Sequence, residues 1–400
     1  MSAFFKTVCT AFIVGFSVGC QSNDMNPLDQ ILNSDMPKIK AIADQLDQHN
    51  VQILYTQIDR DEKGHPTFKE FTFQLDDDLY FYPASTAKLP VAILAIQKVR
   101  QLQAAGVQIG LDDRFVIKDT SGKVIIAQDS TAETGYPSIR HMIKKIFLVS
   151  DNDAYNYLFD FLGRDFVNKE LNKRNLGPSH LNHKFLYGAD NKNTWAFAFY
   201  NAQNELTYAQ QSITSVIDKH NYPLKDIEKG IGYTDNDGTL YQEPFDFSEK
   251  NFFSLKSLNN IMRAIIFPES IPNDNRFDLN KEDYEFLRFW MSRNTFESDY
   301  PNYQTDGYFE SYVKFFLFGD DQGPMPDNIR SYNKVGNAYG TLTEIAYVLD
   351  STNEVEYMLA ATILVNQNQI FNDGVYEYDS LGIPFMAELG RQIHAYELAR

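Results

Sequence analysis

The sequence predicts an α+β fold in which the N- and C-terminal segments share one antiparallel sheet packed with helices. Two strand-like segments, 51–55 and 68–75, lie near the start, with a Lys63-Gly64 turn between them. Apolar residues that alternate with polar ones, rich in β-branched and aromatic types, are typical of a hairpin. Helical periodicity dominates the middle of the chain, and strands return near its end. Strands at both ends around a helical centre favour a single shared sheet.

The remaining elements follow from the spacing of apolar residues, which recur every three or four positions in a helix and alternate in a half-buried strand. An Asp278 start and acidic residues near the N-terminal end support the helix over 280–292. The expected helices cover 36–48, 85–103, 138–149, 153–162, 255–267, 280–292 and 384–398. The expected closing strands cover 332–334, 341–349 and 356–365.

Composition and charge indicate a globular protein that does not bind nucleic acid. The chain has 400 residues, of which 43% are hydrophobic and 22% charged, values ordinary for globular domains. Its formal net charge is −18. A surface this acidic repels phosphate backbones, so nucleic acid is excluded as a partner, whereas the acidity alone identifies no substrate.

The first 19 residues are typical of an export signal. Lys6 is followed by a short apolar stretch that ends in Ser-Val-Gly-Cys at position 20. This ending resembles a bacterial lipobox, so we expect a signal over 1–19, lipidation of Cys20 and a polar tether over 20–35. The protein would then be a lipoprotein of the periplasm or cell envelope, held to a membrane by Cys20. An ordinary cleaved signal peptide is the alternative.

The stretch 190–250 differs from the rest of the chain. It is rich in Asn, Asp, Tyr and Lys and has weak periodicity. We interpret it as an insertion on the helical part of a single domain that covers 36–400. Within it, Asp-Asn-Asp-Gly over 235–238 resembles part of a calcium loop, but the glutamate that an EF-hand needs is missing. A tight hairpin turn is the prediction there.

A serine and a lysine three residues apart can form a nucleophile and its activating base on one helical face. The pattern Ser-x-x-Lys begins three times, at Ser85, Ser311 and Ser331. Ser85 starts a strongly apolar helix and has small neighbours, and a helix N-terminus favours a developing oxyanion. Ser331 falls in an expected strand, where Lys334 would point to the opposite face. Ser85 with Lys88 is the candidate pair, and a helix-capping serine is the alternative.

Two further motifs could complete such a site. Ser-Asp-Asn over 150–152 occurs once, at an expected junction between two helices, where the serine and asparagine can both face a cleft. Lys-Val-Gly over 334–336 lies on an expected strand and is followed by Asn337. Its glycine lets a substrate backbone approach the strand edge.

These three motifs, in this order, resemble the signature of the serine β-lactamases and penicillin-binding proteins. The likeness is greatest to the class A β-lactamase-like serine hydrolases and covers 36–400. It implies a β-lactamase/transpeptidase-like fold and an acyl-enzyme on Ser85. Lys88 would be the base for attack, and Ser150 would relay a proton to the leaving nitrogen. The resemblance implies neither a metal nor an organic cofactor.

The resemblance also implies which groups bind the substrate. Asn152 would hydrogen-bond the substrate amide and hold the general base. Lys334 would bind the substrate carboxylate, with Gly336 beside it. The backbone amides of Ser85 and Asn337 would form the oxyanion hole. The substrate would be a small molecule or a peptidoglycan-derived compound.

Two departures from the family pattern bear on the substrate and on deacylation. Val335 stands where the family usually has Thr or Ser, so a hydroxyl that helps hold the carboxylate is missing. The loop that carries the deacylating glutamate in class A enzymes should cover 178–190, and it contains no glutamate. Glu170 lies earlier, in an expected helix, and is interpreted as solvent-facing or salt-bridged. His183 is a candidate base, with a structural histidine as the alternative.

The sequence therefore favours a penicillin-recognising serine hydrolase that acts on β-lactams or D-alanyl peptides. Without a deacylating base the acyl-enzyme would persist, which suits a penicillin-binding protein or peptidase. A catalytically silent sensor module of the same fold and an esterase on another substrate are the alternatives.

Overall fold

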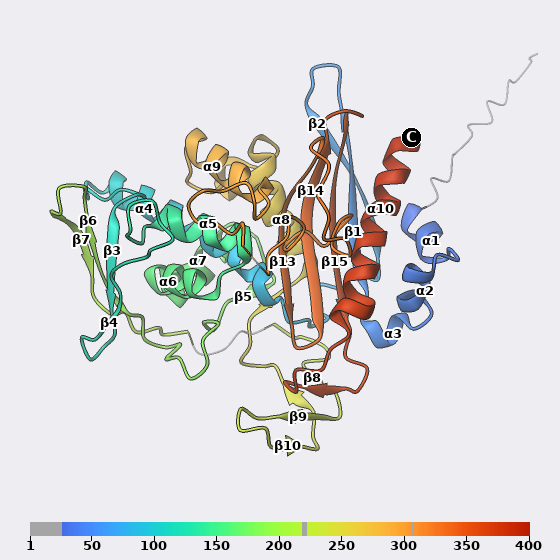
Figure 1. Ribbon diagram of the computed structural model, residues 1–400, viewed down its shortest axis with the longest axis horizontal. Coiled ribbons are helices and arrows are strands. Elements are labelled where there is room, and N and C mark those ends of the chain that lie inside the picture. Colours follow the sequence, from blue (N-terminus) through green and yellow to red (C-terminus); the bar gives the residue numbers. More distant parts are fainter. Residues whose placement is uncertain (1–25, 218–221, 306) are drawn as a thin grey trace, which may run out of the picture.

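The computed structural model describes residues 26–217, 222–305 and 307–400. The expected signal segment 1–19 and Cys20 lie outside the described residues. Within the described ranges, every helix is too short or too polar to cross a lipid bilayer. A five-stranded antiparallel sheet stands between two layers of helices (Figure 1).

The central sheet joins both ends of the chain, as the sequence predicts. Its strand order is β13-β14-β15-β1-β2, so β1 from the start of the chain lies beside β15 from its end. In this antiparallel pair Gln52 is opposite Thr362, and Gln57 is opposite Tyr357. The α+β class is therefore confirmed, and β13 is the outermost strand on one side. The strands are β1 (Gln52–Arg60), β2 (Pro66–Phe73), β13 (Ile329–Ala338), β14 (Thr341–Asp350) and β15 (Val355–Leu364).

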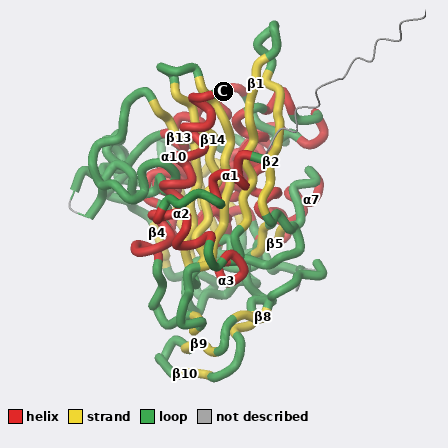
Figure 2. The backbone as a smooth tube through the Cα atoms, turned by 90° about the vertical axis from the view of Figure 1, so that its right-hand side faces the viewer, coloured by secondary structure: helices red, strands yellow, loops and turns green. Residues whose placement is uncertain are grey.

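Helices cover both faces of this sheet, which explains why its inner strands are buried at most positions. In β14 every residue except Leu349 is buried. The C-terminal helix α10 and the short N-terminal helices lie on one face (Figure 2), and α8 packs on the other. These helices are α1 (Pro27–Leu32), α2 (Pro37–Ala43), α3 (Leu46–His49), α8 (Leu255–Ile266) and α10 (Ile383–Ala399).

The helical layer beyond α8 carries most of the core. α4 is buried on nearly all sides, because α5, α6 and α7 pack around it. Side chains cap these helices: Ser138 accepts a hydrogen bond at the start of α5, and Asp151 does so at the start of α6. The helices are α4 (Lys88–Ala104), α5 (Ile139–Val149), α6 (Asn152–Leu162), α7 (Arg164–Lys173) and α9 (Lys281–Ser292).

Three predicted helices differ from the structure at their ends. The single helix expected over 36–48 is two helices, because the backbone at Gln45 leaves the helical region between α2 and α3. The helix expected from residue 85 begins as a 3-10 turn, η1 (Ala84–Ala87), before α4. α9 starts at Asn280 and not at Asp278, since Asn280 and Asp283 form a reciprocal capping box.

The stretch 190–250 has two parts with different surroundings. Its first part adds two strands to a four-stranded sheet of order β4-β3-β6-β7 at the far end of the helical layer. Its second part forms short strands below the central sheet, where β9 pairs with β16 from the C-terminal region. The turn at 235–238 joins β9 to β10, as the tight-hairpin prediction requires.

The short strands of these regions are β3 (Arg114–Lys118), β4 (Val124–Ile126), β5 (Ser179–His180), β6 (Ala196–Tyr200), β7 (Leu206–Gln210), β8 (Glu228–Lys229), β9 (Gly232–Thr234), β10 (Leu240–Tyr241), β11 (Phe245–Asp246), β12 (Phe252–Phe253) and β16 (Ile370–Phe371). The single-turn helices are η2 (Pro268–Ser270), η3 (Asn273–Asn275) and η4 (Tyr378–Gly382).

Candidate active site

Ser85 lies in η1, where the chain enters the buried helix α4. Ala84, immediately before it, has a φ of 45°, in the left-handed region that costs a residue with a Cβ about 1 kcal/mol or more. The surrounding packing therefore holds this turn in a strained conformation. Ser85 is half-buried, whereas Ala84 and Thr86 on either side are buried. Its hydroxyl makes no hydrogen bond within residues 26–217, 222–305 and 307–400, so it is available to a ligand.

Lys88, one turn further along, is fully buried and directed at the Ser-Asp-Asn motif. Its Nζ donates to Asn152 Oδ1 at 2.6 Å, to Ser150 Oγ at 3.3 Å and to the Ser150 carbonyl oxygen. Burial lowers the pKa of Lys88 from 10.5 to about 7, while Asp151 and Asp153 oppose this shift. A lysine with this pKa is partly neutral near pH 7 and can accept a proton.

The junction between α5 and α6 presents Ser150 and Asn152 to Lys88. Ser150 ends α5 in the left-handed conformation, with a φ of 57°. Asp151 caps the next helix by accepting a hydrogen bond from the Ala154 amide at 2.8 Å. The aspartate of the motif therefore shapes the turn, and its two neighbours provide the polar groups of the site.

Lys334, on β13, also approaches Ser150. Its Nζ donates to Ser150 Oγ at 2.8 Å and to the Val335 carbonyl oxygen at 2.8 Å. Burial, with the nearby charges of Lys88 and Lys314, holds the pKa of Lys334 well below its usual range. Ser150 Oγ thus accepts from two amines, which leaves its own proton free to be donated into the cleft.

Gly336 brings β13 against the turn that carries the nucleophile. A Cβ on Gly336 would lie 2.6 Å from the Ser85 amide nitrogen and 2.7 Å from the Pro83 carbonyl oxygen. Only glycine permits this approach. The next residue, Asn337, is exposed. The side chain of Val335 points to the face of the sheet opposite to Gly336 and is buried in the core with Leu342. A hydroxyl at position 335 would therefore lie in that core.

The structure thus joins Lys88, Ser150, Asn152 and Lys334 in one hydrogen-bonded group and brings Gly336 against the backbone of Ser85. The other two copies of the Ser-x-x-Lys pattern do not form such a site. Ser311 donates to the Asp321 carbonyl oxygen at 2.6 Å and is buried. Ser331 is also buried, and it lies on the face of β13 opposite to Lys334.

Behind β13 the structure holds a buried network that the sequence analysis missed. Lys314 Nζ donates to the carbonyl oxygens of Met291 and Ser331, both at 2.8 Å, and to Asn333 Oδ1 at 2.6 Å. Glu344 Oε2 accepts from the Phe316 amide at 2.6 Å, and its other oxygen accepts from Asn333. A glutamate within the otherwise apolar strand 341–349 is the sequence signal that could have indicated it.

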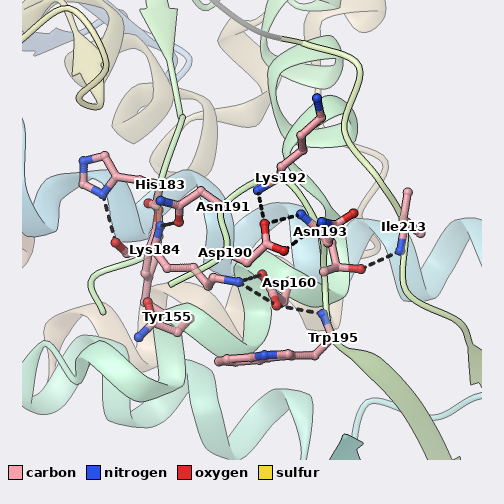
Figure 3. A network of polar contacts seen from close by, with 12 residues as sticks. Tyr155, Asp160, His183, Lys184, Asp190, Asn191, Lys192, Asn193, Trp195 and Ile213 are labelled. Atoms are coloured by element: carbon pink, nitrogen blue, oxygen red, sulfur yellow. Dashed lines mark hydrogen bonds and ion pairs between the residues drawn. The ribbon is translucent and has the colours of Figure 1, made fainter. Parts of the chain in front are cut away.

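The loop over 178–190 lies beside the site and is held by buried polar contacts (Figure 3). Lys184 Nζ forms an ion pair with Asp160 at 3.0 Å and lies 4.6 Å from the Trp195 ring centre. Asp160 also accepts from the Trp195 amide at 2.9 Å. The loop is therefore anchored to α6 through Asp160.

His183 in this loop contacts Tyr82 and the backbone of Lys184. Its Nδ1 lies 2.9 Å from the Lys184 carbonyl oxygen and therefore carries the proton. Its Nε2 lies 3.5 Å from the Tyr82 hydroxyl, and the two rings are stacked. Burial lowers the pKa of His183 to about 4, so it is neutral and a weak base at pH 7.

Glu170 has the salt-bridged role that the sequence allowed. Its Oε2 pairs with Arg174 at 2.5 Å and accepts from Gln97 Nε2 at 2.6 Å, all three side chains being buried. These contacts join α7 to α4. The carboxylate is buried and paired there, so its role is structural.

Comparison with known proteins identifies the family of the chain. The chain matches the sequence profile of the Beta-lactamase enzyme family over residues 36–396. None of the curated proteins matches it. A solved beta-lactamase from Sphaerobacter thermophilus DSM 20745 is similar, with 13% identity, a TM-score of 0.47 and coverage of 90% of this chain and 96% of that chain. A beta-lactamase from Burkholderia ambifaria shows 11% identity and a TM-score of 0.49, over 90% of this chain and 99% of that chain. Because the family match spans most of its length, this chain belongs to the beta-lactamase enzyme family.

Proposed function

We propose that the protein is a serine hydrolase that forms an acyl-enzyme on Ser85 with β-lactams or D-alanyl peptides in the bacterial envelope. One observation carries the proposal: two buried lysines with lowered pKa values converge on Ser150 Oγ, beside a half-exposed serine. Desolvating two amines is costly, and such groups cluster where proton transfer is needed.

The acylation step follows from these contacts. Neutral Lys88 accepts the Ser85 hydroxyl proton while Oγ bonds to the carbonyl carbon of the amide. The backbone amides of Ser85 and Asn337 stabilise the oxyanion. The carbon–nitrogen bond then breaks, and Ser150 donates its proton to the leaving nitrogen. Ser150 then regains a proton from protonated Lys88, which holds the proton taken from Ser85, so charge and protons balance.

A polar cleft of about 990 Å³ has Phe185, the neighbour of Lys88, in its lining, and we take it as the approach for the substrate. Tyr82, His183 and Tyr339 also line it, and Lys250 lies over the Tyr339 ring at 5.6 Å. Its volume is large enough for a small molecule or a peptide fragment of the cell wall. The N-terminal segment supports an envelope location, with lipidated Cys20 as the membrane anchor.

The test is the intact mass of the purified protein after incubation with a penicillin, followed over time. We expect an adduct of one penicillin that is absent from Ser85→Ala. A lasting adduct supports a penicillin-binding or peptidase role, and fast ring opening without an adduct supports a β-lactamase. Neither adduct nor product, with equal hydrolysis of an activated ester by wild type and Ser85→Ala, would indicate a silent binding module.

A further inference from the structure

Phe185 is the residue of the 178–190 loop that faces the general base. The centre of its ring lies 5.2 Å from Lys88 Nζ, within the range of a cation–π contact. Lys88 takes part in the proton transfers at Ser85, so Phe185 lies beside the place where the ester bond of an acyl-enzyme would form. An aromatic ring there excludes water and cannot accept a proton.

The position of Phe185 is well determined by its neighbours. Its amide donates to Asn156 Oδ1 at 2.7 Å, on α6 one turn after Asn152. Its ring packs against Tyr155, with ring centres 4.5 Å apart, and edge-on against His183 at 5.9 Å. The Lys184–Asp160 ion pair next to it fixes the loop (Figure 3). Phe185 is thus part of a rigid wall.

Asn156 carries an unused donor beside Phe185. The side chain is buried, and its Nδ2 has no hydrogen-bond partner in the described part of the chain. Leaving a buried amide donor unpaired costs about 1–3 kcal/mol, so most such groups find an acceptor. The other end of this amide already binds Phe185. A carboxylate in place of the ring would therefore have two cationic or polar partners at hand, Asn156 and Lys88.

Hydrolysis of an acyl-enzyme needs a base that this wall lacks. The water oxygen bonds to the carbonyl carbon, the bond to Ser85 Oγ breaks, one water proton goes to the base and Oγ regains a proton. Among the groups that could accept this proton, Asp160 pairs with Lys184 and neutral His183 lies beside Tyr82. Lys88, the base of the acylation step, faces the ring of Phe185.

We propose that Phe185 determines the fate of the acyl-enzyme: by filling the position opposite Lys88 with an apolar ring, it makes the site retain its acyl group or pass it to an acceptor other than water. This inference rests on the proposed function. It assigns a residue outside the three motifs as the determinant of acyl-enzyme lifetime.

The test compares Phe185→Glu with Phe185→Gln, which has the same length and no base. The penicillin adduct is formed on the full-length protein, free penicillin is removed, and the loss of adduct is followed by intact mass. We expect lasting adducts on the wild type and Phe185→Gln, and loss about 100-fold faster in Phe185→Glu, the usual contribution of a general base. Equal loss from both variants overturns the inference.

Two further measurements separate the possible failures. Phe185→Ala leaves room for formate, a small carboxylate that can act as the base in place of the ring. Added formate should therefore speed loss of the adduct in that variant and not in the wild type, and no response to formate also counts against the inference. His183→Asn tests the other candidate base in the loop: a longer adduct lifetime in that variant would assign the base to His183 and overturn the role of Phe185. If the wild type forms no Ser85-dependent adduct, the proposed function fails, whereas a lasting adduct with equal variants overturns only the role of Phe185.

Discussion

Replacing Gly336 by alanine tests whether the contact between β13 and the nucleophile turn sets the reactivity of Ser85. The new Cβ would lie 2.6 Å from the Ser85 amide nitrogen, 2.7 Å from the Pro83 carbonyl oxygen and 2.8 Å from the Thr86 amide nitrogen. All three are backbone atoms, so no flexible side chain can move aside. Ordinary contact begins at 3.4 Å, and the strand and the turn must therefore separate by up to about 0.8 Å.

A displacement of this size at a reacting group costs about 100-fold in rate. We expect the second-order rate constant for acylation of Gly336→Ala by a fluorescent penicillin to fall by that factor. The overpacking should also cost about 1–3 kcal/mol of stability. Thermal melting measures this loss and shows that the variant is folded.

Val335→Ala is the matched control, because it is the adjacent residue and its side chain lies in the core on the other face of β13. Removing its methyl groups should cost about 2 kcal/mol of stability and leave acylation nearly unchanged. Acylation of Gly336→Ala at close to the wild-type rate would refute the reasoning. An equal loss of rate in Val335→Ala would show that stability, and not the position of Ser85, controls the rate.

Three other predictions follow from named contacts. The acylation rate should rise about tenfold from pH 6 to pH 8, because Lys88 has its pKa lowered to about 7 and must be neutral to act; a flat profile would contradict its role as the base. Lys314→Met leaves three acceptors without their donor and should lower the free energy of unfolding, measured by urea denaturation, by about 3 kcal/mol. The control Lys281→Met, at an exposed position, should change it little, and similar losses in both variants would show that the buried network does not stabilise β13. Glu170→Ala should lower stability by about 3 kcal/mol, since Arg174 loses its buried partner, and leave acylation unchanged; a slower reaction would contradict its structural role.

The sequence was sufficient for most of the architecture, because the patterns involved are local. The β-branched and aromatic residues of 51–55, the alternation over 68–75 and the helical spacing in the centre predicted the strands of the first hairpin and the main helices. The ends of the helices were less predictable. Asn280 and not Asp278 starts α9, since the capping box with Asp283 decides the start, and α2 ends at Ala43 because the chain turns to pack α3 against the sheet.

The residues of the candidate site can likewise be divided into those that the sequence predicts and those that it does not. Each motif has its own local signal, so Ser85, Lys88, Ser150 and Lys334 could be named from the order of the motifs. The sequence could not indicate Phe185, because an aromatic residue in a loop carries no sign of what it will face. Nor could it show that Val335 points into the core, which depends on the pairing of β13 with β14.

What the sequence by itself determined is the fold class, the three motifs and the lack of a glutamate in the 178–190 loop. What only the tertiary structure decided is how the separate elements meet. Lys88 and Lys334 lie on elements far apart in the chain, and their pKa values fall because packing removes both amines from water. The charges of Lys88 and Lys314 lower the pKa of Lys334 further. Desolvation and Coulomb interactions depend on distance in space and not on separation in sequence, so the chemistry of this site exists only in the folded chain.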